Sequence, residues 1–325
     1  MPALSVLDFA SILEGETAKD SFKRSVSLAQ HAENLGYERI WYAEHHNMKS
    51  IASSAPAVLI AHIGAKTSKI RLGSGGVMLP NHSPLVIAEQ FGTLAELYPN
   101  RIDLGLGRAP GTDGKTLQAL RRDYSAAEHF PQDVKELQGY LSGSTLIPGI
   151  EAIPGKGTNV PLYILGSSLF GASLAAALGL PYAFASHFAP THLEEAIKVY
   201  RERFQPSEHL AEPYVIAAVN VVASDTKDDA EAQLETAKRA RVKNMVGRGR
   251  DYSEAELDML INSAPGQQIL SMLQYTAVGT ANEVKDYLLR FTNRVQADEL
   301  MLSPLSPSEE GVHKTLDIVA AELID

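Results

Sequence analysis

The feature of this 325-residue chain that most limits its fold is a repeated alternation of short β-rich runs with longer amphipathic stretches. Such alternation favours a parallel sheet, and eight units over this length fit an α/β fold of the (β/α)8 TIM-barrel type better than an open doubly wound sheet, which remains the alternative. The predicted strands are 4–8, 39–43, 69–76, 101–107, 160–165, 182–185, 214–223 and 297–302. The predicted helices are 17–35, 54–66, 85–97, 168–178, 190–204, 226–246 and 308–323.

Two insertions interrupt the alternation, one after strand 4 and one after strand 7. Residues 108–160 include a stretch rich in glycine and proline, 143–159, which predicts a loop. Residues 247–276 are polar, partly helical and less periodic. Long excursions from a barrel are often lids or interface elements. We therefore expect one domain over 1–325, with pocket walls supplied by both insertions.

The composition excludes several classes of protein. The absence of cysteine excludes disulfides, thiolate metal sites and cysteine nucleophiles. A net charge of −10 disfavours nucleic-acid binding, and the basic run 238–243, with Arg248 and Arg250, is interpreted as a solvated helix face and loop. No apolar run approaches the roughly 20 residues that span a bilayer, and no signal peptide is visible. We expect a cytoplasmic protein with no membrane partner.

Small or polar residues follow five successive predicted strands, where a barrel enzyme places its chemistry. They are Glu44, His45 and His46 after the second strand, Gly75, Gly76, Asn81 and His82 after the third, Arg108, Ala109 and Gly111 after the fourth, Gly166, Ser167 and Ser168 after the fifth, and Ser186 and His187 after the sixth. One or two such endings could arise by chance, whereas five in succession indicate a site at this end of the barrel.

Arg108, Ser167 and Ser168 are candidates for a phosphate site. Arginine offers a fork of donors, and serine at a helix start stands beside exposed N–H groups. Taken alone, Arg108 has a more ordinary interpretation as a surface charge on a turn, and the two serines have one as a helix cap. The two segments follow adjacent strands, however, so together they could bind one phosphate group.

A zinc site is the main rival interpretation of Glu44, His45 and His46. Metal-binding pairs usually have a spacing of four on a helix or two on a strand, whereas adjacent residues on an extended chain point to opposite faces. His82 and His62 are interpreted as structural histidines. The sequence therefore predicts no metal site. A serine hydrolase is also disfavoured, because the Gly-x-Ser-x-Gly elbow is absent.

Four motifs together resemble the bacterial luciferase-like flavin monooxygenases, most closely their single-chain, uncharacterised oxidoreductases. They are Trp-Tyr-Ala-Glu-His-His-Asn at 41–47, the glycine-rich stretch 72–90, Asp-Leu-Gly-Leu-Gly-Arg-Ala-Pro-Gly at 103–111 and Leu-Gly-Ser-Ser at 165–168. The resemblance extends to 279–284 and 297–300, so it covers nearly the whole chain. Each motif is weak alone, but their combination is specific.

The resemblance implies reduced FMN at the C-terminal face of the barrel. His45 would be the catalytic proton donor or hydrogen-bond partner, and Glu44 would support it. The implied cofactor-binding residues are Gly75, Gly76, Arg108, Ala109, Ser167 and Ser168. The family often has a non-prolyl cis peptide that would fall at Gly75–Gly76. Ser186 replaces an aromatic residue of the light-emitting enzymes, which argues against luminescence.

The implied activity is oxygenation of a small organic substrate by reduced FMN and O2. No nicotinamide-binding motif is visible, so a separate flavin reductase is the expected partner. Family members are commonly homodimers through the helices beside strands two and three. A deazaflavin-dependent hydride-transfer enzyme, a flavin-binding protein without catalysis and, third, a metal-dependent hydrolase remain alternatives.

Overall fold

Eight parallel strands close into a barrel in the computed structural model, which describes residues 1–109, 111–247 and 250–324. The barrel strands are β1 (Ala3–Asp8), β2 (Arg39–Tyr42), β3 (Arg71–Met78), β4 (Ile102–Gly107), β5 (Leu162–Gly166), β6 (Tyr182–Phe184), β7 (Val215–Ala223) and β9 (Glu299–Pro304). Each pairs with its neighbour in this order, and β9 also pairs with β1. The predicted barrel is confirmed and the doubly wound sheet is excluded. Arg248, part of the basic run discussed above, lies outside the described residues.

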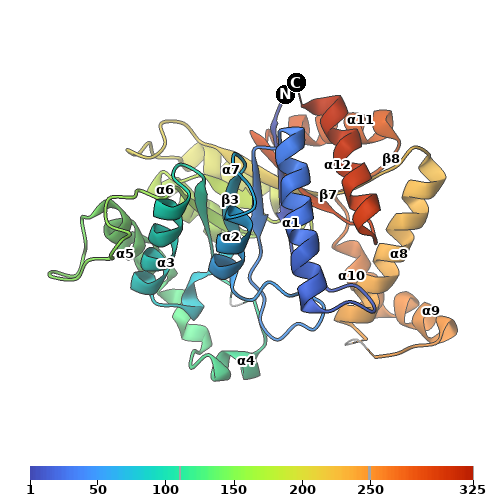
Figure 1. The fold of residues 1–325 in the computed structure, drawn as a ribbon, viewed down its shortest axis with the longest axis horizontal. Coiled ribbons are helices and arrows are strands. Elements are labelled where there is room, and N and C mark those ends of the chain that lie inside the picture. Colours follow the sequence, from blue (N-terminus) through green and yellow to red (C-terminus); the bar gives the residue numbers. More distant parts are fainter. Residues whose placement is uncertain (110, 248–249, 325) are drawn as a thin grey trace.

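The helices form a layer outside the barrel (Figure 1). They are α1 (Ala18–Leu35), α2 (Pro56–Gly64), α3 (Pro84–Leu97), α5 (Phe130–Ser142), α6 (Leu169–Leu178), α7 (Leu193–Arg203), α8 (Lys227–Met245), α11 (Ala281–Val295) and α12 (Glu309–Leu323). The two termini lie together at the end of the barrel opposite to α4 (Gly114–Ala119) and α9 (Glu254–Asn262). Among the described helices, none combines the length and apolarity needed to cross a bilayer.

One strand beside the barrel and the helix that follows it were not predicted. Strand β8 (Thr276–Gly279) pairs with the last residues of β7, and α11 follows it. The strand has only four residues, so it offers little periodicity. Helix α11 has a clearer signal, because Thr280 and Glu283 form a capping box at its start.

The two insertions contain more helix than the sequence indicated. The first holds α4, the 3-10 turn η2 (Tyr124–Glu128) and α5, which packs against α3 and so takes the place of a barrel helix. The predicted loop is confirmed, because none of the described residues 143–159 lies in a helix or strand. The second holds α9 and α10 (Ala264–Ser271).

Buried charges fill the end of the barrel where the strands begin. Arg39 donates to Asp103 at 2.7 Å, to Glu299 at 2.9 Å and to the hydroxyl of Tyr163 at 2.8 Å. All four side chains lie at or next to the first residue of a strand and are buried. Charges that are buried and mutually paired are costly to separate. This packed network closes that end, so a ligand reaches the barrel from the other.

Candidate active site

A cavity of about 1810 Å³ lies at the ends of the strands and is lined by residues from most of the barrel wall. A pocket for one small organic ligand typically measures roughly 300–1,000 Å³. This cavity therefore has room for two ligands side by side. Its walls include Thr112 and Phe130 from the first insertion and Tyr252 and Leu257 from the second, as expected from the sequence.

Most of the predicted site residues line this one cavity. Those that do so are His45, Gly75, Arg108, Ala109, Ser167 and Ser168. Glu44 and Gly76 lie behind the cavity wall. The structure therefore brings together residues from the ends of β2, β3, β4 and β5, but it gives Glu44 and Gly76 supporting positions.

Glu44 is a fully buried anchor for the loop that carries the histidine pair. Its Oε1 accepts from Nε2 of His46 at 2.7 Å and from Nε2 of His82 at 2.8 Å, and its Oε2 accepts from the backbone N–H of Met78 at 3.0 Å. Burial alone would raise the pKa of Glu44, but the hydrogen bonds from both histidines and from Met78 outweigh it and hold the pKa below its usual value. Glu44 is therefore an ionised group that joins β2 to β3.

Glu44, His46 and His82 are also a set that could hold a metal, because one ligand atom of each lies within 4.8 Å of the others. The sequence did not suggest this set, since His82 is 38 positions from Glu44. Both imidazoles, however, direct Nε2 at the same carboxylate oxygen, as ring N–H donors do. The contacts are consistent with a hydrogen-bonded anchor, which agrees with the structural role expected of His82.

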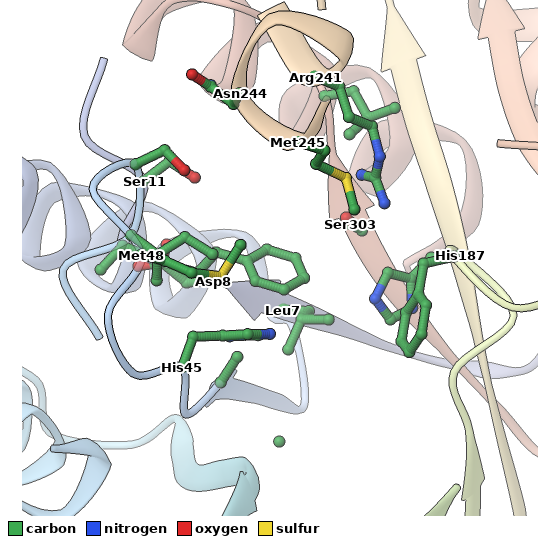
Figure 2. Close-up of a pocket in the computed structure, with 18 of the residues that line it drawn as sticks. Leu7, Asp8, Ser11, His45, Met48, His187, Arg241, Asn244, Met245 and Ser303 are labelled. Carbon is green, nitrogen blue, oxygen red and sulfur yellow. The ribbon is translucent and has the colours of Figure 1, made fainter. Parts of the chain in front are cut away.

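His45 points into the cavity (Figure 2). Its backbone N–H donates to the carbonyl of Ser53 at 3.0 Å, which fixes the loop. Its Nδ1 is buried and has no hydrogen-bond partner among the described residues. Burial lowers the pKa of His45, and the attraction of Glu44 only partly opposes this effect. The imidazole is thus neutral at pH 7 and has a free nitrogen for a ligand.

Arg108 reaches across to the start of α6. Its guanidinium lies over the ring of Phe170, 4.1 Å from the centroid, and Phe170 follows Ser168 by two positions. Ser168 is the N-cap of α6, but within the described chain its side chain makes no capping hydrogen bond. The first N–H groups of α6 are therefore left open beside a cation. This arrangement suits an anion, because the helix N-terminus, the serine hydroxyl and the guanidinium all offer donors.

Gly75 and Gly76 are joined by a cis peptide bond, at the position where the family resemblance placed one. A Cβ on Gly75 would lie 3.0 Å from Cβ of Trp41, and one on Gly76 would lie 2.8 Å from the carbonyl oxygen of Gly105. Gly75 borders the cavity, whereas Gly76 allows β3 and β4 to approach closely.

Sequence reasoning missed Arg241. The basic run 238–243 was interpreted as a solvated face, which is wrong for this residue. Its side chain enters the cavity, and burial lowers its pKa. The helical spacing of Ala230, Leu234 and Ala237 would have placed Arg241 on the inward face of α8.

The fold and the cavity define a barrel enzyme whose cavity holds an arginine near an uncapped helix start and a neutral histidine. A family model described as luciferase-like monooxygenase matches residues 3–296. A luciferase-like monooxygenase of Escherichia coli (strain K12) is 47% identical and aligns over 93% of this chain and 91% of its own length. The N-acetyl-S-alkylcysteine monooxygenase of Bacillus subtilis (strain 168) is 35% identical over 97% of this chain and 96% of its own.

The solved structure of apo-MsnO8 has 34% sequence identity, a TM-score of 0.89, and coverage of 99% of this chain and 98% of its own. With the family model matching most of the chain, these likenesses confirm the resemblance found in the motifs. The chain belongs to the luciferase-like monooxygenase family, a family of oxygenating oxidoreductases.

Proposed function

We propose that this protein is an FMN-dependent monooxygenase that uses reduced FMN and O2 to oxygenate a small organic substrate. The observation that carries the proposal is the placement of Arg108 beside the open N-terminus of α6, in the same cavity as the neutral His45. Arg108 and the N-terminus of α6 would bind the phosphate of FMN, and His45 would face its reacting ring.

The phosphate would be held by Arg108, by the hydroxyls of Ser167 and Ser168, and by the first N–H groups of α6. Hydrogen bonds between a guanidinium and a phosphate are short and strong. Ala109 would contribute backbone beside them. Gly75, which has no side chain to fill the cavity, would let the planar ring approach the backbone of β3.

His45 would be the catalytic residue. Reduced FMN supplies the electrons with which one oxygen atom of O2 enters the substrate while the other leaves as water. The neutral imidazole of His45 can hold or release a proton at Nδ1, which has no partner in the described structure. Glu44 would act as a positioning residue, because it holds the loop from behind and does not face the cavity.

Binding of FMN and riboflavin by the purified protein tests the proposal. The two flavins share the ring and differ in the phosphate. We expect the wild type to bind FMN at least about tenfold more tightly, since charge-assisted hydrogen bonds contribute about 1.5–3 kcal/mol each. R108Q should remove most of that difference. R203Q, at an exposed position at the end of α7, is the matched control and should retain it.

Equal affinity of the wild type for FMN and riboflavin would contradict the phosphate site. Oxygen consumption with reduced FMN then separates an oxygenase from a flavin-binding protein without catalysis. The same titration with a deazaflavin cofactor tests the hydride-transfer alternative.

We also propose a homodimer formed through α2 and α3. Val58, Val86 and Leu97 are apolar side chains exposed on these two helices. Apolar patches on the surface of a soluble protein mark interaction sites. The V58E variant should be monomeric in light scattering where the wild type is dimeric.

We further propose that a separate reductase supplies the reduced flavin. Cytoplasmic placement and a single domain over 1–325 stay predictions.

A further inference from the structure

The cavity has a further cation, Arg241, carried by a different wall from Arg108. Arg241 extends from α8 towards His187 and Ser303 (Figure 2). We propose that Arg241 binds an oxyanion of the substrate, so that the substrate is a small organic molecule with a carboxylate or a sulfonate. The inference rests on the proposed function for the fate of this molecule, but not for its binding.

Arg241 lacks the partners that the neighbouring arginines have. Its Nε is buried without a hydrogen bond, and no ion pair joins Arg241 to any acid in the described ranges. Arg239, two positions earlier on α8, pairs with Glu254 and Asp258 at 2.6 Å each. Arg241 is partly buried, and a charge that is partly removed from water without a partner is costly. Such a group in a cavity indicates a ligand of opposite charge.

No acidic residue that lines the cavity forms an ion pair with Arg241 among the described residues. Glu16 pairs with Arg24 at 2.8 Å, and Glu14 lies 3.4 Å from Lys243. Asp8 directs Oδ1 at the backbone N–H of Ala10 at 2.7 Å. Burial raises the pKa of Asp8, and this carboxylate forms no ion pair with Arg241 in the described structure. An anion from outside the chain is therefore the partner that fits.

His187 supplies a second donor beside Arg241. Its Nδ1 is buried and unpaired among the described residues, and its carbonyl is held by Nδ2 of Asn220 at 2.8 Å. Burial, with further contributions from Arg241 and His45, lowers the pKa of His187 to about 3. The ring is therefore neutral, and its Nδ1 can donate to an oxyanion when it carries the proton.

The space between Arg241 and His45 is lined by apolar side chains. Phe9 lies between the two histidines, with its ring centroid 5.9 Å from that of His45 and 5.8 Å from that of His187. Met245 and Leu7 also line this part. A short amphipathic anion would place its charge at Arg241 and its apolar part over Phe9, towards His45.

Calorimetric titration with three probes of equal chain length tests the proposal. The probes are hexanoate, hexane-1-sulfonate and the neutral hexan-1-ol. We expect at least one of the anions to bind the wild type about tenfold or more tightly than the alcohol, as a charged hydrogen bond predicts. R241Q should lose this preference, and R239Q should retain it. R241M, which replaces the charge by an apolar chain, is the second variant and should behave as R241Q does.

The preferred probe also identifies the source of the charge. Tighter binding of hexanoate indicates a carboxylate substrate, and tighter binding of the sulfonate indicates a sulfonate. Binding without any preference for an anion, or a preference that survives both R241Q and R241M, would overturn the inference. Loss of FMN affinity in R241Q with unchanged anion affinity would also overturn it, because the guanidinium would then serve the cofactor.

The titrations are made with and without FMN to separate this inference from the proposed function. An anion preference that depends on Arg241 in a protein that binds no FMN would support the inference and contradict the proposed function. FMN binding that depends on Arg108, in a protein that shows no anion preference, would support the proposed function and contradict this inference.

Discussion

Replacing Glu44 by glutamine tests the anchor behind the active site. The carboxylate accepts from His46, His82 and the N–H of Met78. Glutamine has the same shape, but only one of its terminal atoms accepts. If the side-chain oxygen of glutamine keeps the hydrogen bonds from both histidines, the NH2 group faces the backbone N–H of Met78. The N–H of Met78 then has no acceptor.

The magnitude follows from these three bonds. Converting two charge-assisted bonds to neutral ones loses about 1 kcal/mol each, and a buried unpaired N–H costs about 2 kcal/mol, which gives a total of about 4 kcal/mol. In a chain of this size 1 kcal/mol shifts the melting temperature by roughly 2 °C, so E44Q should melt about 8 °C lower than the wild type. E96Q, at an exposed position on α3, is the matched control and should melt with the wild type.

The stability lost in E44Q should depend on pH in a defined way. The pKa of Glu44 is lowered from 4.5, so its stabilisation is present above that value and is lost as the pH falls through the folded-state pKa. The pKa of His46 is raised from 6.5 by its bond to Glu44, so that stabilisation is complete below 6.5 and is lost as the pH rises through the folded-state pKa. The difference between wild type and E44Q should therefore be largest between about pH 4.5 and 6.5.

Scanning calorimetry of wild type, E44Q and E96Q from pH 4 to 9 measures this dependence. We expect the gap in melting temperature to narrow above pH 7, without closing, because neutral imidazoles still donate. A gap that is absent near pH 5.5, or one that has the same size at every pH, would refute the proposed network.

Three further predictions concern the cavity and its walls. H45N should lower the rate of oxygenation by about a hundredfold, as loss of a general acid or base does, while FMN affinity changes less than twofold in a binding titration. G76A should lower the free energy of unfolding by about 1–3 kcal/mol, because its Cβ meets the carbonyl of Gly105 at 2.8 Å; unchanged denaturant midpoints would contradict this. D8N should raise the melting temperature at pH 8 but not at pH 3, since the raised pKa of Asp8 makes its ionisation destabilising as the pH rises above 3.8.

The barrel could be predicted because its evidence is local and repeated. Most of the eight barrel strands contain a short apolar run, and the predicted bounds lie within two residues of those observed. The pattern was weakest where a strand is only four residues long, as in β8, and where a helix such as α5 is embedded in an irregular insertion. Short runs have little periodicity, so pairing with a long neighbour such as β7 decides their structure.

The candidate site was predictable where residues follow successive strands, because the barrel brings strand ends together. It was not predictable where the partner is remote in sequence. His82 joins Glu44 and His46 only because η1 (Leu79–Asn81) turns the chain after β3. Arg241, by contrast, could have been found from the apolar spacing on α8, but most of the charged residues of that helix face solvent and obscure its one inward position.

The most direct test of the central claim is a crystal structure of the protein with FMN bound. We predict the phosphate within hydrogen-bond distance of Arg108, Ser168 and the first N–H groups of α6, with the ring between Gly75 and His45. A phosphate bound at Arg241, or a ring that does not contact His45, would contradict the account.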